Sequence, residues 1–311
     1  MISERIDEIT RISPEYRNII LPAPKSVKIE LTGNCNFSCT FCARSQKLRD
    51  VDTIDRSFFE RITKEMMQAG VEELGLFYLG ESFMVPWLPE AIKYAKDIGF
   101  PYVFLTTNGS LAFPDRTQAC MEAGLDSLKF SYNYADAEQL HDIARVKSKY
   151  FLAIQNNIKF AHRIREENGY KCGLYASYIE YDGEQGQRML KAVDEIKDYV
   201  DEVYALPLYS HGGYVTEQEK AAGMKPSGGN RGRLLNLVDP LPCWATLTEG
   251  HITFDGKLNA CCFGHTEDLI MADLNQVGFM EGWNSIEFQA LRAAHLKKDV
   301  RGTPCENCFR I

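Results

Sequence analysis

The chain has 311 residues, of which 45% are hydrophobic and 25% are charged, as is ordinary for a globular protein with a full core. Its 35 basic and 43 acidic residues give a net charge of -8, which disfavours a polyanionic partner such as bulk nucleic acid. The sequence has no apolar run approaching the roughly 18 residues of a membrane span, and its start lacks the apolar segment of a secretory signal. We therefore expect a cytoplasmic protein with no membrane partner and no nucleic-acid partner.

Residues 1–25 carry Ile2, Ile6 and Ile9 at helical spacing and then several prolines. This pattern predicts a short helix and a lead-in that cover one end of the core. From residue 26 to residue 210, short apolar runs alternate with helical patterns, which predicts six βα repeats around a parallel sheet.

The expected strands of this region are 26–31, 73–79, 102–107, 127–132, 171–179 and 202–206. The expected helices are 55–69, 87–98, 114–123, 138–167 with a break near Ser148, and 184–199. Periodicity alone allows either a partial barrel or a doubly wound open sheet. Both topologies place ligands at the carboxyl ends of the strands.

The composition changes after Pro207. Residues 211–240 are rich in glycine and lack periodicity, which predicts a linker or loop near the mouth of the site. Residues 241–311 then form a small second unit. Two strands, 248–254 and 258–262, flank the turn signal Asp255-Gly256, and a helix is expected at 285–296.

Three cysteines, Cys35, Cys39 and Cys42, form a C-x3-C-x2-C run directly after the first expected strand. Four cysteines close a zinc site or fill every iron of a 4Fe-4S cluster, so a local set of three leaves one metal position open or takes a fourth ligand from elsewhere. An open iron is a place for chemistry. The alternatives are a zinc site completed by a distant residue and buried cysteines that bind no metal.

The stretch from Cys35 to Cys42, with the aromatic Phe41 before the third cysteine, resembles the signature of the radical S-adenosylmethionine (radical SAM) superfamily. The resemblance implies a 4Fe-4S cluster whose fourth iron is chelated by SAM, and a 5'-deoxyadenosyl radical that abstracts a hydrogen atom from the substrate. It also favours a partial (β/α)6 TIM-like barrel within the α/β class. A reducing partner such as flavodoxin or ferredoxin would supply the electron.

The resemblance extends to residues that would hold SAM. Residues 79–82 are similar to the family's Gly-Gly-Glu-Pro motif, with Leu79 and Ser82 as departures, and this places Glu81 near the SAM ammonium. At the end of the third strand, residues 106–109 offer polar groups to SAM or simply form a polar turn. The full predicted cofactor-binding set is Gly80, Glu81, Ser82, Thr106, Thr107, Asn108, Ser131 and Arg145.

A second set of cysteines lies in the C-terminal unit: Cys243, Cys261, Cys305 and Cys308. A unit of about 70 residues with one hairpin and one helix has little core, so a metal–thiolate staple would supply stability. The spacing fits zinc or iron–sulfur equally well. It resembles the SPASM/twitch extensions of radical SAM enzymes, which implies an auxiliary 4Fe-4S cluster, of the shorter twitch type because the tail has five cysteines.

The fifth cysteine of the tail, Cys262, directly follows Cys261. Neighbouring residues of a strand face opposite sides, so Cys262 would point away from the auxiliary cluster, either toward the substrate or into the core as a small apolar residue. Toward the substrate, its thiol could deliver a hydrogen atom to a substrate radical, as in the radical SAM epimerases that this tail resembles. Cys120 and Cys172 are expected to be packing residues.

The overall resemblance is to radical SAM enzymes that act on hydroxyl-bearing carbons of sugars and aminocyclitols, such as 2-deoxy-scyllo-inosamine dehydrogenase and neomycin C epimerase. It implies a carbohydrate-like substrate, with Cys262 as hydrogen donor and Glu180 or His211 as base. A maturase of a ribosomally made peptide and a zinc-stabilised binding protein are the alternatives. Further candidates for the substrate pocket are Tyr132, Asn133, Tyr178 and Tyr209.

Overall fold

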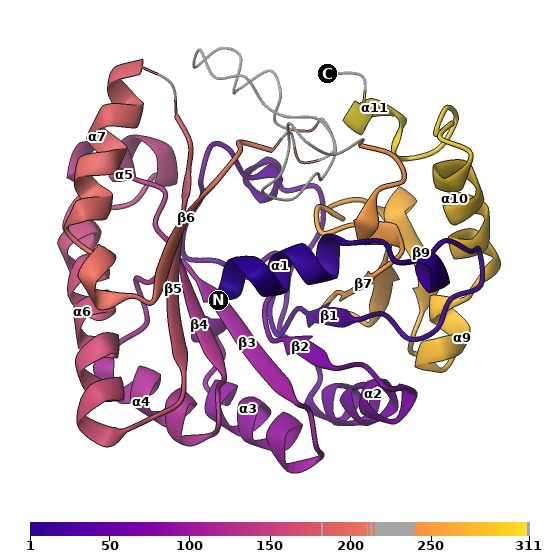
Figure 1. The fold of residues 1–311 in the computed structure, drawn as a ribbon, viewed down its shortest axis with the longest axis horizontal. Helices are drawn as coiled ribbons and strands as arrows, with labels where there is room; N and C mark the ends of the chain where they lie inside the picture. Colours follow the sequence, from indigo (N-terminus) through magenta and orange to yellow (C-terminus); the bar gives the residue numbers. More distant parts are fainter. Residues whose placement is uncertain (182, 210, 212–213, 215–239, 310–311) are drawn as a thin grey trace.

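The computed structural model describes residues 1–181, 183–209, 211, 214 and 240–309. In this part of the chain one nine-stranded sheet has the order β6-β5-β4-β3-β2-β1-β7-β8-β9 (Figure 1). The predicted linker at 211–240 lies outside the described residues, except for residues 211, 214 and 240.

The first six strands are parallel and follow one another in chain order across the sheet. They are β1 (Ser26–Ile29), β2 (Glu73–Gly75), β3 (Tyr102–Thr107), β4 (Ser127–Ser131), β5 (Gly173–Ile179) and β6 (Glu202–Leu206). The predicted α/β class with a parallel sheet is confirmed. β1 and β2 end earlier than predicted, because the chain leaves the sheet there to form the loops that carry the site.

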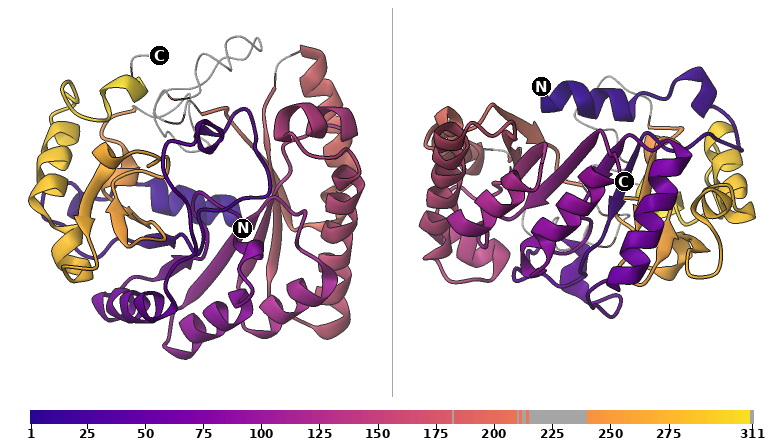
Figure 2. Two further views of the ribbon diagram at one scale, coloured as in Figure 1. Left: turned by 180° about the vertical axis from the view of Figure 1, so that it is seen from behind. Right: turned by 90° about the horizontal axis from the view of Figure 1, so that it is seen from below.

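Helices cover the outer face of this curved sheet (Figures 1 and 2). They are α2 (Arg56–Ala69), α3 (Leu88–Asp97), α4 (Pro114–Glu122), α5 (Ala137–Ala144), α6 (Tyr150–Asn168) and α7 (Gly183–Asp194). The break predicted near Ser148 is the gap between α5 and α6. At the start of α2, the Asp55 side chain accepts a hydrogen bond from the Phe58 backbone N–H, and Gly70 ends the helix with a φ of 94°.

The two faces of the strands differ in chemistry. On β4, Leu128 and Phe130 are fully buried, whereas Lys129 and Ser127 line a cavity inside the curve of the sheet. Parallel strands covered by helices on both faces are usually apolar throughout. The alternation of polar and apolar residues therefore marks an inner face that surrounds a polar cavity.

Helix α1 (Ile2–Thr10) lies across the concave side of the sheet (Figure 1). Its Ile2, Ile6 and Ile9 line the cavity, as their helical spacing predicts. The Arg5 guanidinium pairs with Glu73 of β2 and lies 3.5 Å from the centroid of the Tyr102 ring. The predicted lead-in helix thus closes one side of the barrel.

The C-terminal hairpin continues the barrel sheet. β7 (Glu249–Ile252) pairs in parallel with β1, and β8 (Lys257–Asn259) and β9 (Ile270–Asp273) follow as antiparallel strands. The short helices α9 (Phe279–Trp283), α10 (Ile286–Leu296) and α11 (Glu306–Phe309) complete the unit.

The predicted second hairpin strand, 258–262, is too long. β8 ends at Asn259, so Cys261 and Cys262 lie in the turn that follows it. The strand-alternation argument for their opposite directions was therefore wrong, and their directions depend on the turn. In the described part of the chain, no helix is long and apolar enough to cross a membrane.

Candidate active site

The loop that follows β1 carries Cys35, Cys39 and Cys42 and is held from within by Arg44. The Arg44 side chain donates three hydrogen bonds to main-chain oxygens of this loop, at 3.1 Å to Gly33, 3.1 Å to Phe37 and 3.2 Å to Cys35. A planar guanidinium presents its donors in a fixed fork, so one side chain can fix three carbonyl groups. Arg44 therefore sets the shape of the cysteine loop.

Gly80 brings the end of β2 against the same loop. A Cβ atom at this position would lie 2.0 Å from the Thr32 carbonyl oxygen and 2.7 Å from that of Asn34. The next residue, Glu81, donates its backbone N–H to the Asn34 oxygen at 2.8 Å. Glycine is therefore required here because two backbone segments meet without room for a side chain.

The buried Glu81 carboxylate joins the ends of β2 and β3. It accepts hydrogen bonds from the Thr107 hydroxyl and the Asn108 backbone N–H, both at 2.8 Å, and from the Phe83 backbone N–H at 3.1 Å. Burial raises the pKa of Glu81, and these three donors oppose the rise. Each carboxylate oxygen has two lone pairs. Oε1 already accepts two of these hydrogen bonds and Oε2 accepts one, so Oε2 can accept one more, for example from an ammonium group.

Asn108 connects the β3 turn to the first cysteine. Its side-chain amide donates to Asn36 Oδ1 at 2.9 Å and approaches Cys35 Sγ at 3.9 Å, and Asn36 in turn donates to the Ser110 hydroxyl at 2.8 Å. The predicted polar turn and the cysteine loop thus form one hydrogen-bonded unit.

The three cysteines are partly buried, in surroundings that suit metal-bound thiolates. Burial raises the pKa of Cys35 to about 11 and raises the pKa values of Cys39 and Cys42, so the free thiols keep their protons. A bound iron cluster would displace those protons. The Tyr134 hydroxyl lies 2.9 Å from Cys39 Sγ, where it can donate to a thiolate. The donor set therefore fits a cluster held by three cysteines.

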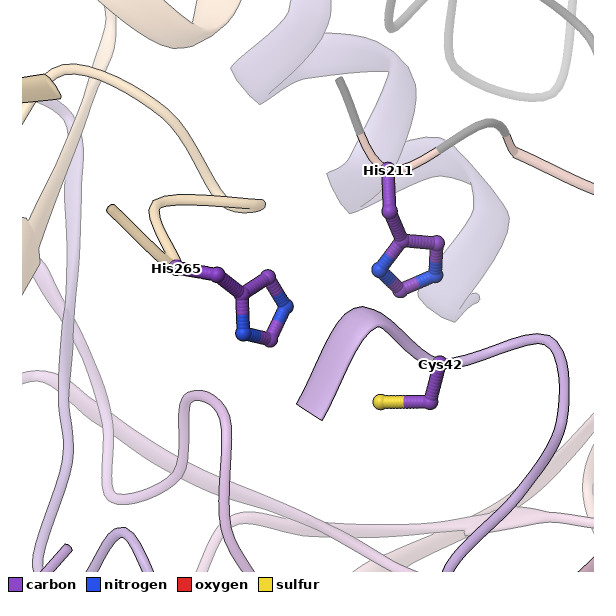
Figure 3. A group of neighbouring side chains, drawn as sticks. All are labelled: Cys42, His211 and His265. Atoms are coloured by element: carbon purple, nitrogen blue, oxygen red, sulfur yellow. The ribbon is translucent and has the colours of Figure 1, made fainter. Parts of the chain in front are cut away.

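Two histidines lie beside the third cysteine (Figure 3). The ligand atoms of Cys42, His211 and His265 are within 4.8 Å of one another, although the residues follow three different strands, β1, β6 and β8. His211 Nδ1 and His265 Nε2 are buried without a hydrogen-bond partner among the described residues. One sulfur and two nitrogens are also a donor set for zinc. Cys42 belongs both to this group and to the three-cysteine set.

The four C-terminal cysteines meet around a second, separate cavity. Cys243 precedes a 3-10 turn, Cys261 follows β8, and Cys305 and Cys308 lie at α11, yet all four line this cavity. Burial raises the pKa of Cys305 to about 12 and that of Cys243 still further. Four cysteines around one space, one buried and three partly buried, are the donor set of a closed metal site.

His295 of α10 is fully buried between two of these cysteines. Its Nδ1 accepts the Cys243 backbone N–H at 3.1 Å, and its Nε2 lies 3.3 Å from Cys305 Sγ. Burial lowers the pKa of His295 to about 4, so the ring is neutral near pH 7. Because Nδ1 is the acceptor, the ring proton is on Nε2 and points at the Cys305 sulfur.

Cys262 lines the barrel cavity, whereas Cys261 lines the cavity of the four cysteines. The two residues are adjacent in the chain, so a single peptide bond links the two cavities. The barrel cavity also reaches toward the first cysteine loop: Phe263 lines it, and the His211 ring lies 4.5 Å from the Phe263 ring.

Only some of the other predicted site residues lie at the barrel cavity. Thr106 lines the barrel cavity, and Ser131 is partly buried at the end of β4. The Ser82 hydroxyl is used within the fold, since it donates to the Leu76 oxygen at 2.6 Å. Arg145 and Glu180 are exposed, and neither of them lines the barrel cavity.

Sequence reasoning missed Arg44, Tyr134, His265 and His295. Arg44 offered a local signal, since it lies two residues after the third cysteine. The other three reach the cysteines only through long-range packing, and nothing in their local sequence indicates it.

The fold and these two cysteine sites define a class of protein: a partial α/β barrel with a three-cysteine site at its loops and a four-cysteine site beside its sheet. Residues 29–175 match the radical SAM superfamily, and residues 243–309 match the SPASM iron–sulfur cluster-binding domain. The chain therefore contains a radical SAM domain followed by a SPASM domain. These domains indicate a SAM-binding 4Fe-4S cluster and auxiliary iron–sulfur binding.

Curated relatives match parts of the chain. A probable GTP 3',8-cyclase of Methanothermobacter marburgensis is 31% identical over 120 residues, which is 39% of each chain. A PqqA peptide cyclase of Methylobacterium nodulans is 28% identical over 145 residues, 46% of this chain and 37% of that protein. The chain thus spans about two fifths of the length of these relatives.

Two solved structures share the fold over most of the chain. SuiB of Streptococcus suis bound to its precursor peptide SuiA superposes with a TM-score of 0.65 and 15% identity, covering 87% of this chain and 67% of SuiB. BtrN in complex with AdoMet and 2-DOIA superposes with a TM-score of 0.55 and 13% identity, covering 88% of this chain and 87% of BtrN. At these identities the likeness is one of fold.

Proposed function

We propose that this protein is a radical SAM enzyme that abstracts a hydrogen atom from a hydroxyl-bearing carbon of a sugar-like small molecule, giving epimerisation or two-electron oxidation. The observation that carries the proposal is the three-cysteine loop that follows β1, together with a barrel cavity lined by Cys262 and connected to that loop through Phe263 and His211. When bound, the cluster and SAM supply a 5'-deoxyadenosyl radical. The residues of the chain orient SAM and substrate and exclude water.

Cys262 is the residue that we assign to the epimerisation. Its side chain lines the barrel cavity, where a bound substrate would meet it. An S–H bond is weaker than most C–H bonds, so this thiol can give a hydrogen atom to a carbon radical and close a new C–H bond. For a second turnover, the reducing partner must return one electron and one proton to the sulfur.

Oxidation is the other outcome that the arrangement supports. The substrate radical would lose an electron to the auxiliary cluster and its hydroxyl proton to a base. Cys261 lines the cavity of the four cysteines and is the chain neighbour of Cys262, which lines the barrel cavity. Of the two base candidates, His211 lies against Phe263 of the cavity wall, whereas Glu180 is exposed. We therefore favour His211 for this role.

The first test is metal content and SAM cleavage in protein purified without oxygen. We expect a brown protein with roughly eight iron atoms per chain. It should convert SAM to 5'-deoxyadenosine when dithionite supplies electrons. In the cytoplasm, where we propose that the protein acts, reduced flavodoxin or ferredoxin would supply them. A colourless zinc protein that does not cleave SAM would instead support the non-catalytic binding protein.

The second test separates epimerisation from oxidation. Sugars and their derivatives are incubated with the enzyme and SAM in heavy water, and deuterium uptake at carbon is measured by mass spectrometry. We expect Cys262→Ala to lose deuterium uptake while SAM is still consumed. The matched control is Cys172→Ala, at a buried residue outside both cavities, which should retain uptake. Unchanged turnover in Cys262→Ala would assign Cys262 to packing and favour oxidation.

A peptide maturase is the second candidate, favoured by the similarity of residues in this chain to a PqqA peptide cyclase and by the fold shared with peptide-bound SuiB. A peptide substrate would receive the radical on a side chain. Parallel incubations with deuterated peptides and with deuterated sugars distinguish the two candidates. If the protein is a peptide maturase, deuterium should appear in 5'-deoxyadenosine with the peptide and not with the sugar.

A further inference from the structure

The barrel cavity contains an unusual set of charged side chains for the interior of a protein. Three cations, Arg5, Lys28 and Lys129, line it together with two carboxylates, Glu73 and Glu249. Charges removed from water are stable only when they are paired or well hydrogen-bonded. The pairing of these groups therefore shows which charged side chain has no partner of opposite charge in the cavity.

Two of the three cations are paired. Arg5 forms an ion pair with Glu73 at the start of β2. Lys28 Nζ lies 2.8 Å from both oxygens of Glu249, and Glu249 Oε2 also lies 2.8 Å from His251 Nε2. These partners lower the pKa of Glu249 to about 2 against the opposing effect of burial, so its charge is fully engaged.

Lys129, in the middle of β4, is the unpaired cation. Among the described residues it forms no hydrogen bond and no ion pair, and its Nζ lies over the Tyr204 ring, 5.9 Å from the ring centroid. Burial, and then the positive charge of Lys28, lower the pKa of Lys129 to about 8, against the opposing attraction of Glu249, which is already paired with Lys28 and His251. The fold therefore leaves a lysine facing the cavity with no anion in direct contact among the described residues.

We propose that Lys129 binds an anionic group of the substrate, a carboxylate or a phosphate, inside the barrel. The ammonium group offers three donors and a charge that no carboxylate in the described part of the cavity contacts directly. Lys129 and Cys262 line the same cavity, so one small molecule can contact both. The anionic group would then fix the orientation of the carbon that reacts.

This inference rests on the proposed function and narrows its substrate class. Sugar acids and sugar phosphates carry both hydroxyl-bearing carbons and the required anion. Aminocyclitols carry ammonium groups, which would meet like charge at Lys129 and Lys28 and would be disfavoured.

The experiment uses the full chain with its clusters and two fluorinated probes of nearly the same shape, trifluoroacetate and trifluoroacetamide. Binding is followed by the broadening of their fluorine NMR signals. We expect the protein to bind trifluoroacetate and not the neutral amide. In Lys129→Met, which keeps the length and the apolar stem, the affinity for trifluoroacetate should fall at least about tenfold. Lys129→Arg, which keeps the charge, should retain binding.

The control variant is Lys93→Met on α3, whose exposed side chain pairs with Asp97 and which should bind the probe as the wild type does. Equal binding in Lys129→Met, or equal binding of the amide, would overturn the proposal. Displacement of the probe by SAM would overturn it too, because Lys129 would then belong to the cofactor carboxylate. Competition by inorganic phosphate and by acetate tells which anion fits better, and success of either supports the proposal.

The same wild-type samples are assayed for SAM cleavage without substrate. Cleavage without anion binding would contradict this inference and leave the proposed function intact. Anion binding without cleavage would contradict the proposed function alone.

Discussion

The two cysteine sites of this molecule are built on opposite plans. The first takes three cysteines from one short loop of the chain, and its surroundings include His211 and His265, each with a buried nitrogen that lacks a partner among the described residues. The second takes four cysteines from three segments that together span residues 243–308, and its histidine, His295, has both ring nitrogens engaged.

The difference indicates that the first site binds an exchangeable ligand, whereas the metal of the second site is fully ligated by the protein. Three cysteines in one loop leave an iron position for a ligand that comes and goes, and the loop is braced by Arg44, Gly80 and Asn108 so that it keeps its shape. Four cysteines from distant segments staple the chain around a closed centre. The first site should therefore govern chemistry, and the second should govern stability and electron transfer.

The largest effect is expected from removing a cysteine of the loop. Cys39→Ala should reduce 5'-deoxyadenosine formation by at least about a thousandfold, because the cluster that cleaves SAM loses a ligand, while roughly half of the iron remains in the tail. The control is Cys120→Ala, at a residue buried in α4, which should retain both. Cleavage at the wild-type rate in Cys39→Ala would remove the functional distinction between the sites.

Removing a cysteine of the tail should act mainly on stability. Cys243→Ala breaks the metal staple, and we expect the free energy of unfolding to fall by at least about 4 kcal/mol and the Tm by roughly 10 °C. Anaerobic thermal unfolding followed by circular dichroism measures both. An unchanged Tm would show that the tail folds without its metal.

The support of the loop can be tested without touching a cysteine. Gly80→Ala would place a Cβ atom 2.0 Å from the Thr32 carbonyl oxygen, and we expect a loss of about 3 kcal/mol of stability together with the iron of the first site. In the control Gly278→Ala, the new Cβ meets only Glu65 Oε2 at 3.7 Å, so stability and iron should stay near wild type. If both variants behaved alike, the close approach at Gly80 would not be what shapes the loop.

The smallest effect concerns the redox potential of the tail cluster. His295→Phe removes the donor aimed at Cys305 Sγ, and the potential of the auxiliary cluster should fall on the order of 50 mV, since a hydrogen bond stabilises the more negative, reduced form. Redox titration monitored by electron paramagnetic resonance measures it. His162→Phe on α6 is the control, and equal potentials in both variants would assign His295 a packing role.

Much of the first site could be read from the sequence because its signals are local. The three cysteines, the strand before them, and the Gly80-Glu81 pair each lie within a few residues of the pattern that identifies them. The alternation of Ser127, Lys129 and Ser131 with apolar residues is also present in the sequence, but only the structure shows that this strand faces a cavity.

The rest depended on contacts that sequence spacing does not encode. The parallel pairing of β7 with β1 joins segments more than two hundred residues apart and brings Cys262 to the barrel cavity. The directions of Cys261 and Cys262 come from a turn rather than from a strand. His265 reaches Cys42 only because β8 and β1 belong to the same sheet.

The central claim is that the three-cysteine cluster presents an iron that SAM itself coordinates. The most direct measurement is electron–nuclear double resonance on the reduced protein, with SAM isotopically labelled at its amino nitrogen and carboxylate, and with Cys39→Ala protein, which keeps only the auxiliary cluster, as the reference. The account predicts a hyperfine coupling between each label and the cluster. A spectrum without coupling in protein that retains the first cluster would contradict it.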